Sequence, residues 1–226
     1  MPRLRRNREE TDLKRTWMRV CALVIAIVML AAAAPMALAD DKQIFDDVRP
    51  ADWFAEYVSF VYNRGLMDCV WGMYFQPYEA CTRKTVVTAL YNLSGKPFFY
   101  GPTDIFSDIA PNDDCVDAVA WAVAEGIVYG FDDGTFHPYE PVTREQLAAF
   151  MYRYANYSGL RTGYTADFSR FKDVDRISEY ALPAFHWAVA TGVLYGTDEG
   201  TLIPQETATR AQIASILTHF AQGYGF

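Results

Sequence analysis

PVTREQLAAF, residues 141–150, has the pattern of a helix start with one residue out of place. Thr143 and Gln146 fit a capping box, in which the threonine oxygen accepts a backbone N–H and the glutamine returns one. Leu147 and Phe150 then fall on one apolar face. Arg144 does not fit, because a cation in the first helical turn opposes the helix dipole by about 0.3 to 1 kcal/mol.

The same Thr-Arg pair occurs three times in the chain, which indicates an internal repeat of roughly 60 residues. Each pair follows a short Phe-x-Asp motif, an alanine-rich segment ending in glycine, and a loop ending in proline. The pairs are Thr82-Arg83, Thr143-Arg144 and Thr209-Arg210; the opening motifs are Phe45-Asp46-Asp47-Val48, Phe106-Ser107-Asp108-Ile109 and Phe171-Lys172-Asp173-Val174; the loop ends are Phe75-Gln76-Pro77, Phe136-His137-Pro138 and Leu202-Ile203-Pro204.

Apolar residues recur at helical spacing in two segments of every repeat, so each repeat is expected to be a helix-loop-helix unit. One such pair cannot bury both of its apolar stripes alone. We therefore expect an all-α fold in which three tandem repeats pack as a pseudo-threefold bundle. The expected stripes are Ala55/Val58/Tyr62, Val116/Val119/Val123 and Leu182/Phe185/Val189 in the first helices, and Val86/Ala89/Leu90/Leu93, Leu147/Phe150/Met151/Tyr154 and Ile213/Ile216/Leu217/Phe220 in the second.

Residues 1–39 have the pattern of a secretory signal peptide: a basic stretch, an apolar run of about 14 residues, and Ala37-Leu38-Ala39 as the cleavage pattern. The run is shorter than the ~20 residues that a membrane-spanning helix needs. We expect cleavage, no membrane attachment afterwards, and repeats at 40–97, 98–160 and 161–226.

Charge and residue content argue against several functional classes. The whole chain has a net charge of −8; the signal segment holds seven Lys/Arg against three Asp/Glu, so its loss leaves −12. Such acidity disfavours nucleic acid and anionic membranes as partners. The three histidines have no catalytic partner at a motif spacing, so neither an enzyme nor a cofactor is expected. Asp132-Asp133-Gly134 is interpreted as a tight turn, because further calcium ligands at fixed offsets are missing, and no metal site is expected.

These motifs resemble those of the S-layer homology (SLH) family over nearly all of residues 45–222. The resemblance implies a surface-anchoring module that binds secondary cell-wall polysaccharide, often a pyruvylated glycan, in grooves between its units. It assigns glycan contacts to Arg83, Arg144 and Arg210 and places Thr143, Thr209, Gly130 and Gly196 at the site. The matching elements in the third repeat are Phe171-Lys-Asp173-Val174, Trp187-Ala188, Gly192-Val-Leu-Tyr-Gly196, Leu202-Ile-Pro204 and Thr209-Arg210-Ala211-Gln212.

Two roles are open for the arginines. Helix N-termini attract anions, so an arginine beside free N–H groups makes a carboxylate clamp, bidentate from the guanidinium fork. Alternatively, each arginine forms an internal pair with Asp47, Asp108 or Asp173, or with Glu79, Glu140 or Glu206. The family resemblance favours the ligand role. Trp121 and Trp187 could stack on sugars, but their spacing along the helices predicts that both lie in the core.

The first repeat departs from the other two. Cys69 replaces the second loop glycine, and Cys81 stands where Val142 and Ala208 stand. A Cys69–Cys81 disulfide would close the loop and stabilise the fold by about 3 kcal/mol in the chain-entropy model; two unrelated small residues are the alternative. Thr82 lacks a glutamine partner, so its capping box is incomplete. Lys84 either adds charge at the site or is simply solvated, and solvation is the favoured interpretation.

A second functional class uses the same helices differently. No catalytic or adhesive segment is recognisable beside the three repeats, which is unusual for an anchor. The alternative hypothesis is a protein-binding helical scaffold, or a coat subunit of the cell envelope, with other surface proteins as partners.

Overall fold

The computed structural model describes residues 44–226, and the predicted signal peptide lies outside this range. The described part is helical and contains no β-sheet, so the predicted all-α class is confirmed. No helix in it is long and apolar enough to cross a bilayer. The six α-helices are α2 (Ala55–Asn63), α3 (Arg83–Leu93), α4 (Val116–Ala124), α5 (Arg144–Tyr157), α6 (Leu182–Ala190) and α7 (Arg210–Tyr224), with short 3₁₀ turns η1 (Val174–Arg176) and η2 (Glu179–Ala181).

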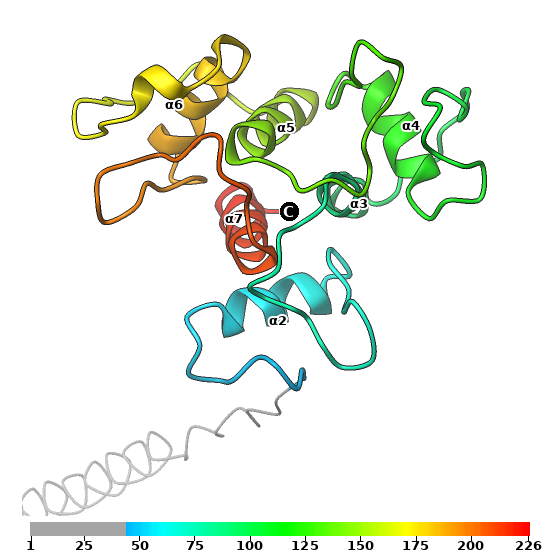
Figure 1. The fold of residues 1–226 in the computed structure, drawn as a ribbon, viewed down its shortest axis with the longest axis horizontal. Helices are drawn as coiled ribbons and strands as arrows, with labels where there is room; N and C mark the ends of the chain where they lie inside the picture. Colours follow the sequence, from blue (N-terminus) through cyan, green and yellow to red (C-terminus); the bar gives the residue numbers. More distant parts are fainter. Residues whose placement is uncertain (1–43) are drawn as a thin grey trace, which may run out of the picture. The chain divides into compact units, whose positions relative to one another are not determined.

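The helices pair between repeats rather than within them. The longer helices α3, α5 and α7 lie around the centre, and the shorter helices α2, α4 and α6 lie outside them (Figure 1). Helix α4 packs on α3, α6 on α5, and α2 on α7. Each of these three helix pairs therefore joins the long helix of one repeat to the short helix of the next. This cyclic order is the one that the expected pseudo-threefold bundle requires.

A ring of three backbone hydrogen bonds closes the centre of this arrangement. The N–H of Cys81 donates to the carbonyl of Ala208 (2.8 Å), that of Ala208 to Val142 (3.0 Å), and that of Val142 to Cys81 (2.8 Å). All three residues are buried. Because each lies immediately before a Thr-Arg pair, the ring holds the three helix starts together.

The aspartate of the Phe-x-Asp motif holds the loop that precedes each Thr-Arg pair. The carboxylate of Asp173 accepts hydrogen bonds from the N–H groups of Leu202 and Ile203, both at 2.8 Å. Ile203 has a φ of +44°, which is costly for a β-branched residue. Two charge-assisted hydrogen bonds hold this backbone in place. The same pattern joins Asp47 to Phe75 and Gln76 (φ +57°), and Asp108 to Phe136 and His137 (φ +56°).

The core confirms the second-helix stripes and corrects the first-helix stripes. All members of the second-helix stripes are buried except Leu93, which is partly buried. In the first helices the central residues Val58, Val119 and Phe185 are buried as expected, but the flanking buried residues lie one position closer to the N-terminus than expected. Leu182 is 37% exposed, whereas the buried residues are Phe54/Val58/Val61, Cys115/Val119/Ala122 and Ala181/Phe185/Ala188. Trp121 and Trp187 are buried, which confirms them as core residues.

The loop glycines Gly130 and Gly196 do not have a positive φ, unlike Gly126 (+67°) and Gly134 (+79°). They are needed for close approach instead. A Cβ on Gly196 would meet the Phe171 ring and lie 2.8 Å from the carbonyl oxygen of Thr201. Gly130 is covered in the same way by Phe106 and Thr135. Cys69 occupies this position in the first repeat, where Phe45 packs on Tyr62 and Phe75.

Replacing Asp173 by asparagine leaves one carbonyl oxygen for two backbone N–H groups, that of buried Leu202 and that of partly buried Ile203. We expect Asp173→Asn to lower the free energy of unfolding by about 1.5 to 3 kcal/mol, measured by chemical denaturation. Asp175→Asn, at an exposed position two residues away, is the control and is expected to stay within about 0.5 kcal/mol of the wild type. Equal stability of the two variants would contradict the role of Asp173.

The loop residue His137 provides a second test. Its Nδ1 lies 2.8 Å from Glu140, and this contact raises the pKa of His137 above its usual 6.5. The stabilisation that protonated His137 gains from Glu140 is fully present below pH 6.5 and is lost as the pH rises through the folded-state pKa of His137. We expect Glu140→Gln to lower the His137 pKa in an NMR titration and the exposed control Glu125→Gln to leave it unchanged. A pKa insensitive to Glu140→Gln would refute the contact.

Candidate functional site

The three repeated arginines are buried, with 3%, 6% and 7% of Arg83, Arg144 and Arg210 exposed. Each reaches from the first turn of its helix into the loop of the following repeat and donates to two main-chain carbonyls. The repeat order is cyclic, because Arg210 of the last repeat reaches the first. The Nε and Nη2 distances are 2.9 Å to Phe136 and 3.4 Å to Tyr129 for Arg83, 2.9 Å to Leu202 and 2.8 Å to Tyr195 for Arg144, and 2.7 Å to Phe75 and 2.6 Å to Asp68 for Arg210.

The first backbone N–H groups of the long helices are not free, contrary to the expectation from the sequence. At the start of α5, the N–H of Arg144 donates to the Glu206 carbonyl (2.9 Å) and that of Glu145 to the Pro204 carbonyl (2.9 Å). The N–H of Gln146 donates to the hydroxyl of Thr143, which completes the predicted capping box. Helices α3 and α7 are satisfied in the same way. An anion site made from open helix N–H groups is therefore absent from these three helix starts.

The alternative internal ion pairs are also not formed. Among residues 44–226, none of the three arginines makes an ion pair with an aspartate or glutamate. The aspartates bind the loop N–H groups, and Glu79, Glu140 and Glu206 contribute their main-chain carbonyls. Burial lowers the pKa of all three arginines, to about 10 for Arg83, so each stays charged at neutral pH. Main-chain carbonyls are thus the acceptors that explain the position of the arginines.

A groove of about 530 Å³, which we call the repeat 3 groove, lies beside Arg144. It is formed by the loop of the third repeat and helix α7. Trp53, from the first repeat, contributes one wall. Its main polar and aromatic lining residues are Trp53, Arg144, Tyr195, Thr197, Asp198, Gln212 and Ser215.

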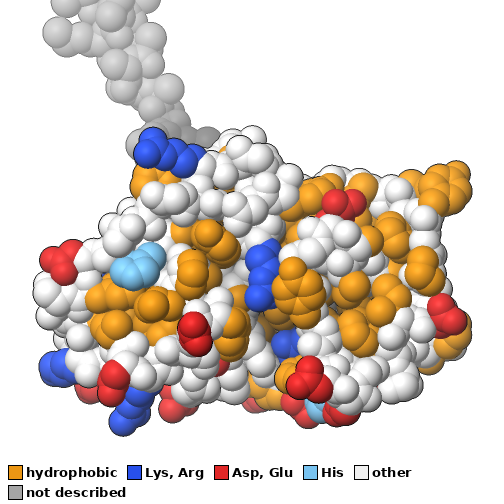
Figure 2. Space-filling model, turned by 90° about the horizontal axis from the view of Figure 1, so that it is seen from above, with side chains coloured by type: hydrophobic (Ala, Val, Ile, Leu, Met, Phe, Trp, Pro, Cys, Tyr) orange, Lys and Arg blue, Asp and Glu red, His pale blue; other side chains and the backbone are white. Residues whose placement is uncertain are grey.

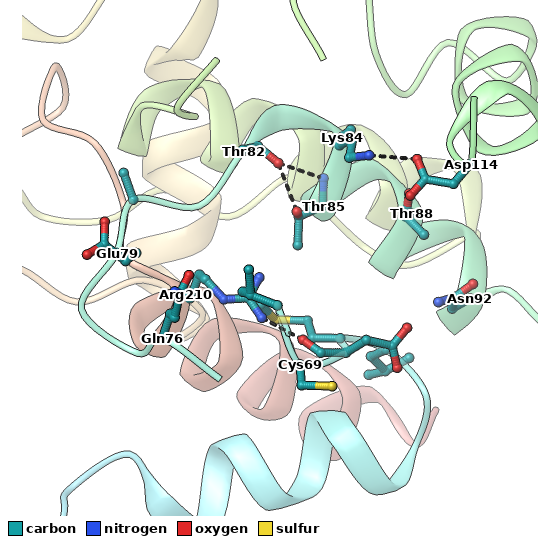
Figure 3. Close-up of a pocket in the computed structure, with 15 residues that line it drawn as sticks. Cys69, Gln76, Glu79, Thr82, Lys84, Thr85, Thr88, Asn92, Asp114 and Arg210 are labelled. Carbon is teal, nitrogen blue, oxygen red and sulfur yellow. Dashed lines mark hydrogen bonds and ion pairs between the residues drawn. The ribbon is translucent and has the colours of Figure 1, made fainter. Parts of the chain in front are cut away.

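The corresponding repeat 1 groove, of about 460 Å³, lies beside Arg210 and helix α3 (Figure 3). Lys84 lines it and pairs with Asp114 at 2.6 Å, while its ammonium group lies 4.6 Å from the ring centre of Tyr139. The prediction that Lys84 is simply solvated was therefore wrong. The N-cap residue Thr82 and the α3 residues Thr85 and Asn92 line the same groove with polar side chains.

The structure brings some of the predicted site residues together and separates others. Arg144 and Gly196 line the repeat 3 groove, and Arg210 lines the repeat 1 groove with Cys69 in the glycine position. Thr143 and Thr209 are helix caps. Sequence reasoning missed Trp53 and Asp114, which line the two grooves from the neighbouring repeat. Both residues stand two positions before the short helix of their repeat. This shared position indicates a groove residue only once it is known which long helix each short helix packs on.

The cysteines do not form the expected bridge. Cys69, Cys81 and Cys115 are all free thiols in the structure. Cys81 belongs to the central ring, whereas Cys69 lines the repeat 1 groove. Burial raises the pKa of Cys81 to about 12, and that of Cys115, which is the N-cap of α4, to about 12 as well. The two buried thiols are therefore protonated and weakly nucleophilic.

Hydrophobic side chains are exposed in separate clusters on the molecular surface, with Lys and Arg side chains between them (Figure 2). Trp53 and Tyr195, which line the repeat 3 groove, are each 59% exposed. Exposed aromatic rings beside polar groups are typical of ligand sites. These rings, rather than the buried Trp121 and Trp187, are the ones available to a ligand.

Three known proteins share similarity with this chain over parts of their length. An endoglucanase from Bacillus sp. (strain KSM-635) is 25% identical over 209 residues, or 87% of this chain and 21% of that protein. An amylopullulanase from Thermoanaerobacterium thermosulfurigenes is 24% identical over 76% of this chain and 9% of its own length. Cell surface glycoprotein 1 from Acetivibrio thermocellus is 30% identical over 92 residues, 40% of this chain and 4% of its own.

This chain spans only 21% of the endoglucanase and 9% of the amylopullulanase, so the catalytic names describe those proteins and not this chain. The family model of the S-layer homology domain matches three tandem segments, residues 44–85, 105–148 and 170–214. Each segment runs from the Phe-x-Asp motif into the long helix that begins with the clamped arginine. The chain therefore belongs to the S-layer homology domain family, whose members are cell-surface anchoring modules.

Proposed function

We propose that this chain anchors to the bacterial cell wall by binding a wall polysaccharide in its inter-repeat grooves. The observation that carries the proposal is the repeat 3 groove. It combines exposed aromatic rings, Trp53 and Tyr195, with hydroxyl and amide side chains beside a fixed guanidinium. Such a mixture suits sugars, whose rings present apolar faces and whose hydroxyl groups need hydrogen-bond partners.

The arginine in each groove has N–H groups that are not used in hydrogen bonds to the loop carbonyls. A guanidinium carries five N–H groups, and Arg144 uses one on Nε and one on Nη2 for the loop carbonyls. Its Nη1 makes no hydrogen bond within the described residues. The edge formed by Nη1 and Nη2 thus supplies charge to an acidic group of the glycan, such as the carboxylate of a pyruvylated sugar. The two carbonyl contacts fix the guanidinium beforehand, so little side-chain entropy is lost on binding.

The acidic charge of the chain limits how it recognises an anionic glycan. With a net charge of −8, the protein offers no long-range attraction to a negatively charged polymer. Affinity then comes from short-range contacts inside the grooves. Binding is consequently expected to depend on individual groove residues and only weakly on ionic strength.

The proposal is tested by sedimenting the protein with isolated cell walls, before and after extraction of the non-peptidoglycan glycan. We expect cosedimentation with intact walls and its loss after extraction. Binding that survives extraction would overturn the assignment of the polysaccharide as ligand. Binding to other envelope proteins in place of walls would favour the protein-scaffold hypothesis.

The contribution of the groove is tested with a matched pair of tryptophan variants. Trp53 and Trp71 are exposed to 59% and 60%, but only Trp53 lines the repeat 3 groove. Trp53→Ala is expected to weaken wall binding about tenfold, for a lost stacking contact of about 1.4 kcal/mol. Trp71→Ala is expected to bind as the wild type does. Equal binding by the two variants would contradict the role of the groove.

A further inference from the structure

The three equivalent groove positions differ in how their arginines are covered. In the second repeat, the guanidinium of Arg83 lies 4.9 Å from the ring centre of Phe131, 4.6 Å from Phe136 and 5.3 Å from Phe150. Arg210 has one ring within this range, Phe75 at 4.5 Å. Among residues 44–226, no ring lies over Arg144. Arg83 therefore has the most aromatic cover of the three arginines.

Phe131 is the residue that covers Arg83 from the loop side of the groove. The residues that align with it are Val70 in the first repeat and Thr197 in the third. Val70 and Thr197 line the two open grooves beside Arg210 and Arg144. A bulky ring therefore stands, in the second repeat alone, where the other repeats have a smaller side chain.

The opposite wall is occupied as well. Tyr180 aligns with Trp53 and Asp114, and its hydroxyl donates to Glu145 at 3.0 Å. Glu145 is buried and also accepts from the N–H and hydroxyl of Ser178. Arg153, on helix α5, places its guanidinium 4.6 Å from the ring centre of Tyr129.

The pairs at this wall differ in all three repeats. In the repeat 1 groove Lys84 forms an ion pair with Asp114, and in the second repeat Glu145 accepts a hydrogen bond from Tyr180. In the repeat 3 groove the aligned residues are Ala211, in place of Lys84 and Glu145, and Trp53, in place of Asp114 and Tyr180. A small alanine gives Trp53 no polar partner at this position. Trp53 is thus left to line the groove, while Tyr180 is tied to its own chain.

We infer that the groove position of the second repeat is closed by this protein's own side chains, so that glycan binds only in the repeat 1 and repeat 3 grooves. Phe131 and the Tyr180–Glu145 pair are the residues that close it. Arg83 is then a structural residue that ties the first repeat to the second, and only Arg144 and Arg210 face ligand. This inference rests on the proposed function, since it specifies which of the three positions that function uses.

Reciprocal exchanges test the inference. Phe131→Thr combined with Tyr180→Ala opens the second-repeat position, and Thr197→Phe covers Arg144 in the third. Thr197 and Tyr100 are both exposed, so Thr197→Phe and the control Tyr100→Thr, outside the grooves, are expected to fold. Thermal unfolding checks the folding of every variant before binding is measured.

The readout is native mass spectrometry with short, size-fractionated fragments of the extracted wall glycan. We expect two fragments per wild-type chain, three for the opened variant, one for Thr197→Phe, and two for the control. Three fragments on the wild type, or unchanged counts in folded variants, would overturn the inference while leaving the proposed function intact. No fragment bound by the wild type would overturn the proposed function, and the inference with it.

Discussion

The hydrogen bonds from one arginine to two carbonyls of the next repeat are the interaction on which the rest of the structure depends. They join the start of each long helix to the loop of the following repeat, and the third of them returns to the first repeat. The central backbone ring runs through the same segments. Because the short helix of each repeat packs on the preceding long helix, no repeat completes its own core. The three repeats therefore stabilise one another as a closed unit.

This linkage also explains how a stabilising residue comes to line a groove. An arginine that reaches into the next loop must lie between two repeats, which is where the grooves form. Its Nε donates to the protein, and in two of the three cases the arginine also lines a groove. Differences among the grooves come from the surrounding side chains, which vary between repeats while the arginine and its carbonyl acceptors do not. The three repeats therefore share the arginine and its carbonyl acceptors, while the side chains that line the grooves differ between repeats.

The helices, their caps and the second-helix faces were predictable because threonine, glutamine and apolar spacing are local signals. The first-helix faces were not, since in an alanine-rich helix such as α4 a one-position shift changes the apolar pattern very little. The acceptors of Arg144 were missed because main-chain carbonyls leave no trace in side-chain identity. Trp53 was missed because it belongs to the first repeat, whereas helix α7 belongs to the third. Long-range packing of α2 on α7 brings them together, and the local sequence does not show this packing. The glycine at position 196 was found, but its reason, the contact with Phe171, needed the folded loop.

Residue-resolved hydrogen exchange on an Arg210→Gln variant tests most directly whether the three repeats form one closed unit. Arg210 links the third repeat to the first and makes no hydrogen bond to the second. A closed unit predicts that amides in α3, α5 and α7 lose protection together and by comparable factors, because opening one link opens the ring. If α5 of the second repeat kept the protection of the wild type while α3 and α7 lost theirs, the repeats would be independent and the account would be contradicted.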